Sequence, residues 1–349
     1  MISNLTITGF RAFRELRVDP LTRVNLFVGK NNAGKTSILE AVELVTLGNF
    51  EAMRRILRRR EERIFTDEST ELDPSHLFYG RLLGNFSIVT RERYVRCLVA
   101  QQSQQIPGTS EAIDSEAYIG LLLEADEKQS FRRLSPFGGL VLPPAIRESA
   151  MARHLSSPTA SAIPVNFVQT DSVDAFRLGQ LWDQVVLTPE EENIAATLRI
   201  IEQRIERIAF IGENRSPSRR IFVKLAGLDQ RIPLGSVGDG LKRLLALTLN
   251  LFSAHSGYLL VDEIDTGLHH SVLMDMWKLV IETAKRLGVQ VFATTHSLDC
   301  VHALAWVQEQ NPDLAAEVTL HRIEKDAPAT TVYSVDEIAI AERGQIEVR

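Results

Sequence analysis

Apolar residues along this chain occur either in short uninterrupted runs or in longer stretches with helical spacing, and the two patterns predict different elements. Residues 2–28 alternate and then become continuously apolar, which predicts two or three strands. Residues 35–47 carry apolar side chains at helical spacing and predict a helix directly after those strands. Short apolar runs at 164–169, 258–261 and 289–294 predict three further strands.

Helices are predicted at 241–254 and 270–286, between the later strands. Alternation of helices with apolar strands is typical of a largely parallel sheet that is covered by helices on its faces. The pattern therefore places the chain in the α/β class.

Residues 190–211 show apolar positions at alternating steps of four and three, which predicts one helix with a single apolar seam. The seam consists of Ile194, Leu198, Ile201, Ile205 and Ile208. Because about two heptads are too few for a long coiled-coil arm, we expect this helix to pack inside a helical lobe. An extended rod is the alternative.

The interval 49–163 has the weakest pattern. Its expected elements are a basic helix near 51–63 and strands at 86–99 and 117–125. Stretches rich in Gln, Ser, Pro and Gly at 101–110 and 135–164 are expected to be loops.

Composition narrows the class of protein. The chain has 349 residues, of which 44% are hydrophobic and 24% charged, and these values are ordinary for globular proteins. A formal charge of −6 argues against coating nucleic acid by bulk electrostatics, although a local basic patch remains open. Cys97 and Cys300 lie far apart without zinc-ligand or disulfide spacing, so a reducing cytoplasm is expected. Residues 1–10 do not resemble a signal peptide, and no apolar run is long enough to predict a membrane span.

Residues 29–36 match the complete G-x-x-x-x-G-K-[ST] pattern of a phosphate-binding loop, between a predicted strand and a predicted helix. The loop consists of Gly29, Lys30, Asn31, Asn32, Ala33, Gly34, Lys35 and Thr36, with Ser37 as a neighbouring donor at the helix start. Such a turn directs backbone N–H groups and the positive end of a helix at phosphate. We expect Lys35 to reach the β and γ phosphates of a nucleoside triphosphate and the Thr36 hydroxyl to bind Mg²⁺.

Polar side chains with catalytic chemistry follow two of the later strands. Asp262 and Glu263 come directly after the run 258–261, where Asp262 is expected to hold Mg²⁺ and Glu263 to polarise an attacking water. His296 follows the run 289–294 and is expected to contact the γ phosphate. A structural hydrogen bond is the alternative role for His296. The carboxyl ends of parallel strands meet at one edge, which predicts that these groups lie beside the phosphate loop.

The order of motifs resembles that of ABC-type ATPases: phosphate loop, strand-end Gln, Ser-x-Gly at a helix start, Asp-Glu, Gly-Leu-His and strand-end His. Within that superfamily the chain is most similar to the SMC-like and OLD-family branch, because residues 7–13 (ITGFRAF) resemble the first strand of DNA-repair and OLD-like ATPases. The resemblance implies that Arg11 lies near the nucleotide and that Gln169 senses Mg²⁺ and water. It also implies a D-loop within 265–269 and makes His296 the switch histidine.

Residues 235–239 (GSVGD) stand at the place of the family's LSGGQ signature and keep only Ser236 and Gly238. Ser236 is expected near the N-cap of the helix at 241–254, where exposed N–H groups make a second anion site. The resemblance implies that this site acts on the ATP of a neighbouring copy, in a head-to-tail homodimer. An ordinary capped helix is the alternative.

The fold implied by the resemblance is a P-loop NTPase of the ABC-type ATPase head class, with a mixed, largely parallel sheet flanked by helices, an antiparallel β portion and a helical lobe. We expect a nucleotide-binding lobe from 1–168 and 258–349, with an insertion at about 49–163. Residues 169–257 are expected to form the helical signature lobe.

A dense basic cluster lies in the expected helix near 51–63. Its arginines are Arg54, Arg55, Arg58, Arg59, Arg60 and Arg63. Glu51, Glu61 and Glu62 stand among them, several at the three- and four-residue spacing that pairs charges on a helix, so a solvated, self-paired helix is the preferred interpretation. Contact with a nucleic-acid backbone is the alternative.

Two other nucleotide-binding classes fit less well. A GTPase needs an N-K-x-D motif, and the nearest sequence, residues 323–326 (IEKD), lacks the asparagine that would recognise the base. A small-molecule kinase shares the phosphate loop but does not need the later motifs in this order.

We therefore expect an Mg²⁺-dependent ATPase whose ATP binding and hydrolysis close and reopen a homodimer. OLD-family nucleases carry a Toprim domain after the ATPase, whereas only 53 residues follow His296 here, and the stretch 329–335 reads as a closing strand. By analogy, the effector is expected to be a separate protein, such as a nuclease in bacterial anti-phage defence. The alternatives are a binding module that holds ATP with little turnover and a DNA-associated ATPase of the DNA-repair type.

Overall fold

The main sheet forms the centre of the molecule, and its strand order is β10-β14-β15-β3-β16-β17. The computed structural model describes residues 1–65, 70–105, 115–140, 163–170, 175–212, 220–334, 336–338 and 340. The strands of the main sheet are β10 (Val165–Val168), β14 (Tyr258–Val261), β15 (Gln290–Thr294), β3 (Val24–Val28), β16 (Val318–Arg322) and β17 (Thr331–Tyr333). All are parallel except β17. This arrangement confirms the largely parallel sheet and the three later strands that the sequence predicted.

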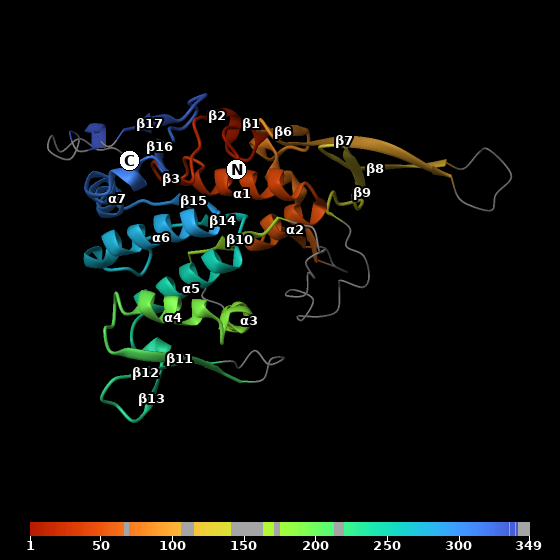
Figure 1. The fold of residues 1–349 in the computed structure, drawn as a ribbon. Helices are drawn as coiled ribbons and strands as arrows, with labels where there is room; N and C mark the ends of the chain where they lie inside the picture. Colours follow the sequence, from red (N-terminus) through yellow and green to blue (C-terminus); the bar gives the residue numbers. More distant parts are fainter. Residues whose placement is uncertain are drawn as a thin grey trace.

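A second sheet is antiparallel and has the order β2-β1-β6-β7-β8-β9. Its strands are β1 (Leu5–Phe10), β2 (Phe13–Val18), β6 (Asn85–Val89), β7 (Tyr94–Gln105), β8 (Ser115–Ala125) and β9 (Lys128–Arg133). Figure 1 shows β7 and β8 reaching well beyond the body of the molecule. Residues 101–105 belong to β7 and are not the loop that the sequence predicted. The remainder of that predicted loop, and most of the one at 135–164, lie outside the described residues.

Two small sheets lie apart from these. One pairs β4 (Arg63–Phe65) with β5 (Thr70–Leu72), and the other consists of β11 (Ile205–Ile211), β12 (Arg220–Leu225) and β13 (Arg231–Pro233). In Figure 1 the sheet of β11, β12 and β13 lies on the opposite side of the helices from the main sheet.

The helices form layers on both faces of the main sheet. They are α1 (Lys35–Leu47), α2 (Phe50–Arg59), α3 (Ala175–Val185), α4 (Pro189–Leu198), α5 (Asp239–Ser253), α6 (Leu273–Leu287), α7 (Leu298–Gln310) and α8 (Pro312–Ala315). Short 3₁₀ turns occur at Pro74–Leu77, Tyr79–Arg81, Leu234–Ser236 and His270–Val272. Within the described part of the chain, no helix is long and apolar enough to cross a membrane.

Alternate side chains of β3 show how the sheet divides the core. Phe27 shares one buried cluster with α1, α2 and the antiparallel sheet, so α1 lies between the two sheets. Leu26 and Val28 share another cluster with helices α3 to α7 on the opposite face. All five side chains of β3 are buried, as expected for a strand covered on both faces. A strand with this burial holds the phosphate loop in one position.

The helix predicted over 190–211 is wrong in its second half. Helix α4 ends at Leu198, and Ile205 and Ile208 lie on strand β11, which pairs with β12. An irregularity between Ile205 and Arg207 shifts the register of β11, so Ile205 and Ile208 are both buried although they stand three positions apart in the sequence. Because of this bulge, the buried residues of a strand have the spacing that is typical of a helix.

The lobe boundaries drawn from the sequence stay a prediction. One core cluster runs across the proposed boundary, since it contains Leu245 of the expected helical lobe together with Val291 of the expected nucleotide-binding lobe.

His321 on β16 predicts how stability depends on pH. Its ring is fully buried and stacks on Phe27, and burial lowers the pKa of this histidine from its ordinary value to about 4. His321 therefore becomes protonated near pH 6.5 in the unfolded state but only near pH 4 in the folded state. Its contribution to the free energy of unfolding is fully present above pH 6.5 and is lost as the pH falls toward 4. The loss is on the order of 3 kcal/mol.

We expect the free energy of unfolding of His321→Asn to fall less steeply than that of the wild type between pH 6.5 and pH 4. Urea unfolding at several pH values measures both slopes. Equal slopes would contradict the buried neutral histidine.

Candidate nucleotide site

The phosphate loop connects the buried strand β3 to helix α1, as the sequence predicted. Gly29 and Gly34 have φ angles of 151° and 99°, which favour glycine. A Cβ atom on Gly34 would lie 2.4 Å from the ring of Phe13, and one on Gly29 would lie 2.5 Å from the carbonyl oxygen of Ile323. A side chain at position 29 or 34 would therefore collide with a neighbouring element, so both ends of the loop require glycine.

The remaining loop residues divide into exposed and buried positions. Lys30, Asn31 and Asn32 are exposed, whereas Ala33 and Ser37 are buried. The exposed positions lie between the two glycines, so the loop backbone there is open to a ligand.

Lys35 is the first residue of α1 and is largely buried. Its Nζ donates to the carbonyl oxygens of Gly29 and Lys30 at 2.6 and 3.0 Å and lies 3.2 Å from Nδ1 of His296. Burial lowers the pKa of Lys35 to about 8, although Asp262 and Glu263 act in the opposite direction. The ammonium group thus lies inside the loop it belongs to, close to two strand ends.

Thr36 brings together residues that are far apart in sequence. Its hydroxyl donates to both carboxylate oxygens of Asp262, at 3.1 and 3.0 Å. The hydroxyl of Thr294, at the end of β15, also donates to Asp262, at 2.7 Å. Oxygen atoms from the start of α1 and from the ends of β14 and β15 therefore lie close together. Hydroxyl and carboxylate oxygens are the ligands that Mg²⁺ prefers.

Glu263 and His296 lie side by side beyond this cluster. Nε2 of His296 is 3.7 Å from Oε1 of Glu263, and both side chains are partly exposed. The hydroxyl of Thr266 donates to Oε2 of Glu263, while the backbone N–H of Glu263 donates to Thr294. Burial, and then the charge of Lys35, lower the pKa of His296, so this ring is neutral at pH 7.

Gln169 is partly buried directly after β10, and the residue that holds its backbone was not among the predicted site residues. Arg243 on α5 donates to the carbonyl oxygen of Gln169 at 2.6 Å. The same guanidinium donates to the carbonyl oxygens of Asp262 and Glu263, at 2.7 and 2.8 Å. Arg243 is buried, and burial lowers its pKa. Its position near the start of the helix predicted at 241–254 was the only available signal.

Ser236 and Gly238 lie in the turn before α5, close to the start of the helix as expected. Helix α5 begins at Asp239 with Gly238 as its N-cap, so Ser236 precedes the cap by two residues. Both residues are exposed. A Cβ atom on Gly240 would lie 2.8 Å from the carbonyl oxygen of Gly267, so the start of α5 packs on the expected D-loop.

Arg11 has its described partners away from the phosphate loop. Its guanidinium forms ion pairs with Glu40 and Glu62, at 2.9 and 2.6 Å, and donates to the carbonyl oxygen of His76. These contacts join the β1–β2 turn to α1 and to the segment after α2. The structure therefore does not bring Arg11 together with the other predicted site residues.

The residues fit a magnesium nucleotide better than a metal held by protein alone. Throughout the described ranges, no group of three or more His, Cys, Asp or Glu side chains is arranged to hold a metal ion. Mg²⁺ is usually bound through one or two carboxylates together with phosphate oxygens. Thr36 and Asp262, next to the loop of Lys35, match that pattern.

Comparison with known proteins supports the same reading. The chain matches a family model described as "AAA domain, putative AbiEii toxin, Type IV TA system" over residues 146–299 and another described as "AAA ATPase domain" over residues 1–76. It is 24% identical over 355 residues to an "ATP/GTP phosphatase" of Helicobacter pylori, covering 93% of each chain. A short segment is 43% identical over 49 residues to the DNA replication and repair protein RecF of Thioalkalivibrio sulfidiphilus, covering 14% of each chain.

Solved structures show the fold. A head domain of Smc bound to the C-terminal winged-helix domain of ScpA has a TM-score of 0.50 at 17% identity, covering 96% of this chain and 98% of that one. The Smc head domain of Pyrococcus furiosus has a TM-score of 0.50 at 14% identity, covering 99% of both. The chain is a P-loop ATPase, an enzyme that binds nucleotide and hydrolyses ATP. Its fold is similar to that of these Smc head domains.

Nucleotide binding should be accompanied by proton uptake near pH 8. The pKa of Lys35 is about 8 in the structure, and a triphosphate beside the ammonium group would raise it. At pH 8 Lys35 should therefore take up about half a proton on binding, and at pH 6.5 its own contribution should be almost none. Calorimetry of a non-hydrolysable ATP analogue in buffers of different ionisation enthalpy measures this uptake. Lys35→Arg, which stays charged, should show no such uptake, and equal uptake in both proteins would contradict the assignment.

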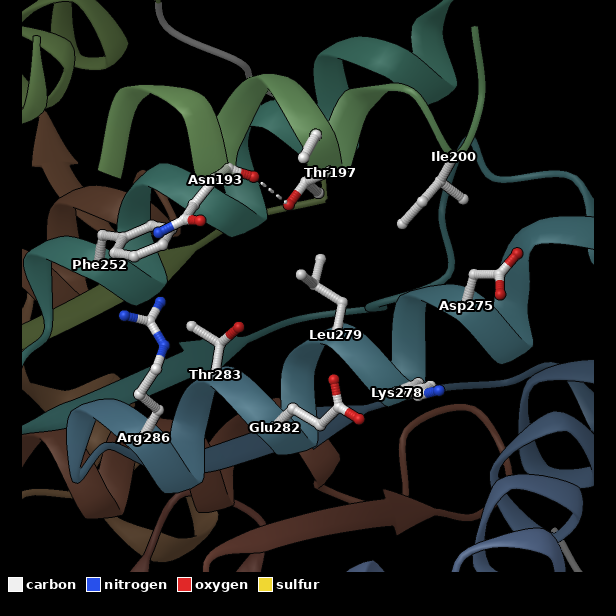
Figure 2. Close-up of a pocket in the computed structure, with 11 residues that line it drawn as sticks. Asn193, Thr197, Ile200, Phe252, Asp275, Lys278, Leu279, Glu282, Thr283 and Arg286 are labelled. Carbon is white, nitrogen blue, oxygen red and sulfur yellow. Dashed lines mark hydrogen bonds between the residues drawn. The ribbon is translucent and has the colours of Figure 1, made fainter. Parts of the chain in front are cut away.

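Arg243 should control catalysis more than nucleotide affinity. Arg243→Lys keeps the charge but cannot hold three carbonyl groups, so we expect kcat to fall about tenfold while ATP affinity stays within about threefold. Steady-state kinetics and equilibrium binding separate the two quantities. Lys278→Ala, which removes an exposed charge on α6 (Figure 2), serves as the control. A selective loss of ATP affinity in Arg243→Lys would contradict this prediction.

Proposed function

We propose that this ATPase holds Mg²⁺–ATP between the phosphate loop and the ends of β14 and β15, and that hydrolysis there opens a dimer that ATP binding has closed. The observation that carries the proposal is the convergence on Lys35 and Thr36 of side chains from two later strands. Asp262 contacts Thr36, and His296 lies beside Lys35. This arrangement brings together a phosphate-binding lysine, a hydroxyl and a carboxylate suited to Mg²⁺, and a strand-end histidine, which are groups that phosphoryl transfer uses.

Each residue of the phosphate loop has a role in this proposal. The N–H groups of residues 29–36 would hold the phosphates, and Lys35 would exchange its carbonyl partners for phosphate oxygens. Thr36 and Asp262 would hold Mg²⁺, which neutralises charge on the phosphates when it is bound. The hydrogen bond from Thr294 keeps Asp262 oriented for that task.

Glu263 is the general base in this proposal. Its carboxylate is partly exposed at the strand end, where a water could approach, and Thr266 restrains one of its oxygens. The neutral ring of His296 can donate or accept one hydrogen bond and so report on the γ phosphate. Arg243 holds the backbone of Gln169 next to that of Glu263 by donating to both carbonyl oxygens. The side chain of Gln169 would then help to position the attacking water.

A second copy completes the site in this proposal. Helix α5 begins without a side-chain cap, because Gly238 is its N-cap, so its first N–H groups are suited to an anion. Ser236 and Gly238 are exposed just before that end. A head-to-tail homodimer would bring them to the ATP of the partner.

We propose a separate effector protein as the target of this cycle. The family model that matches residues 146–299 names a toxin of a toxin–antitoxin system, which supports a role in bacterial defence, and a nuclease remains our preferred effector. The short similarity to RecF supports the alternative of a DNA-associated ATPase. Cys97 and Cys300 are buried free thiols, which suits a reducing cytoplasm.

Glu263→Gln tests the assigned base. The change removes the basic oxygen but keeps the shape of the side chain, so kcat should fall at least 100-fold, within the range of about 10²–10⁴ for general-base catalysis, while ATP still binds. Size-exclusion chromatography with ATP should then show an accumulated dimer. Glu282→Gln, which alters an exposed carboxylate on α6, is the matched control.

Two outcomes would contradict the proposal. Unchanged turnover in Glu263→Gln would remove the assigned base, and a wild-type protein that dimerises with ATP but hardly hydrolyses it would favour an ATP-held binding module.

Ser236→Arg should bind ATP as a monomer, and a normal dimer of this variant would exclude the signature turn from the interface.

A further inference from the structure

We infer that Arg59 and Phe167 form a clamp that positions Gln169 for hydrolysis. The guanidinium carbon of Arg59 lies 3.6 Å from the centroid of the Phe167 ring, and no motif of the chain accounts for this contact. The inference rests on the proposed role of Gln169. It assigns the clamp a task in the same reaction, as a positioning contact that does not touch the nucleotide.

Arg59 is anchored to the helix that begins at the phosphate loop. Its NH2 lies 2.7 Å from Oε2 of Glu43 on α1, and both side chains are largely buried. The next residue, Arg60, pairs with Glu40 on α1 at 2.6 Å. Because Arg59, the last residue of α2, and Arg60 directly after it each pair with a buried carboxylate of α1, the end of α2 is held in place relative to Lys35.

Phe167 belongs to β10, the strand that leads to Gln169. In the described residues β10 pairs with β14 alone and lies at the edge of the main sheet, so a single ladder sets its lateral position. Asn166 fixes the opposite face of β10 by donating to the carbonyl oxygen of Asn250 on α5. Phe167 points to the face of α1 and α2, where it packs on the core that contains α1. Arg59 adds the stacked guanidinium to this packing.

Gln169 stands two residues after Phe167, the spacing that places side chains on the same face of an extended strand. Arg243 holds the Gln169 backbone from one side through its carbonyl oxygen. The stacked ring then limits rotation of the strand end about that bond. A cation–π contact with a largely buried arginine is strong enough to restrain an edge strand in this way.

Phe167→Leu is the primary test, because it removes the ring but keeps an apolar side chain and leaves the pair of Arg59 with Glu43 intact. We expect kcat to fall about tenfold, with the dissociation constant for ATP changed less than twofold. Arg59→Lys keeps the charge beside Glu43 without the planar stack, and it should reduce kcat in the same direction by about threefold.

A double-mutant cycle separates positioning from general packing. In a Gln169→Ala background, adding Phe167→Leu should change kcat less than twofold, because there is no side chain left to position. Val165→Ala on the same face of β10 and Arg55→Ala at an exposed pair of α2 are matched controls, and both should keep kcat within twofold.

The outcomes distinguish this inference from the proposed function. If Gln169→Ala lowers kcat but Phe167→Leu does not, or if their effects multiply, the clamp is overturned and the role of Gln169 stands. If Val165→Ala lowers kcat as much as Phe167→Leu, strand packing explains the effect and the clamp is also overturned. If Gln169→Ala leaves kcat unchanged, both the role of Gln169 and the clamp fail.

Discussion

The contact between Thr36 and Asp262 is the constraint on which the site depends, because it joins the start of α1 to the end of β14 across most of the chain. Strand β15 separates β14 from β3 in the sheet, and its Thr294 hydroxyl donates to the same carboxylate. The parallel ladders set the relative height of these strand ends to within one residue. A shift of one residue in either ladder would turn the strand-end side chains to the opposite face of the sheet and dismantle the site.

Buried arginines provide the rigid frame around this contact. Arg243 joins the ends of β10 and β14 to α5 through backbone carbonyl groups, and Arg59 joins α2 to α1 and β10. Arg11 connects the β1–β2 turn to α1 through Glu40. Removing one partner of such a buried pair costs about 3–5 kcal/mol, whereas an exposed pair is worth less than about 1 kcal/mol. These few buried charges therefore matter more for the geometry of the site than the many surface pairs do.

Sequence patterns predicted the elements of the site well, because each one combines a buried strand with a polar residue directly after it. The limits of α1 and β14 were predicted to the residue, and Asp262, Glu263 and His296 meet beside Lys35 as expected. The basic helix was also predicted as self-paired, and Glu51 does pair with Arg54 within α2. Its strongest partners, Glu40 and Glu43, were not foreseen because they lie on a different helix.

Local pattern alone determined the phosphate loop, the strand ends and the α/β class, since a loop of fixed spacing between strand and helix needs no distant partner to be recognised. Only the tertiary structure decided where Arg11, Arg59 and Arg243 point, that β11 is a strand, and that Ser236 lies beyond the helix cap. Each of these features depends on contacts between segments that are far apart in the chain. A bulge or a buried carboxylate on another element therefore changes the structure that local spacing predicts.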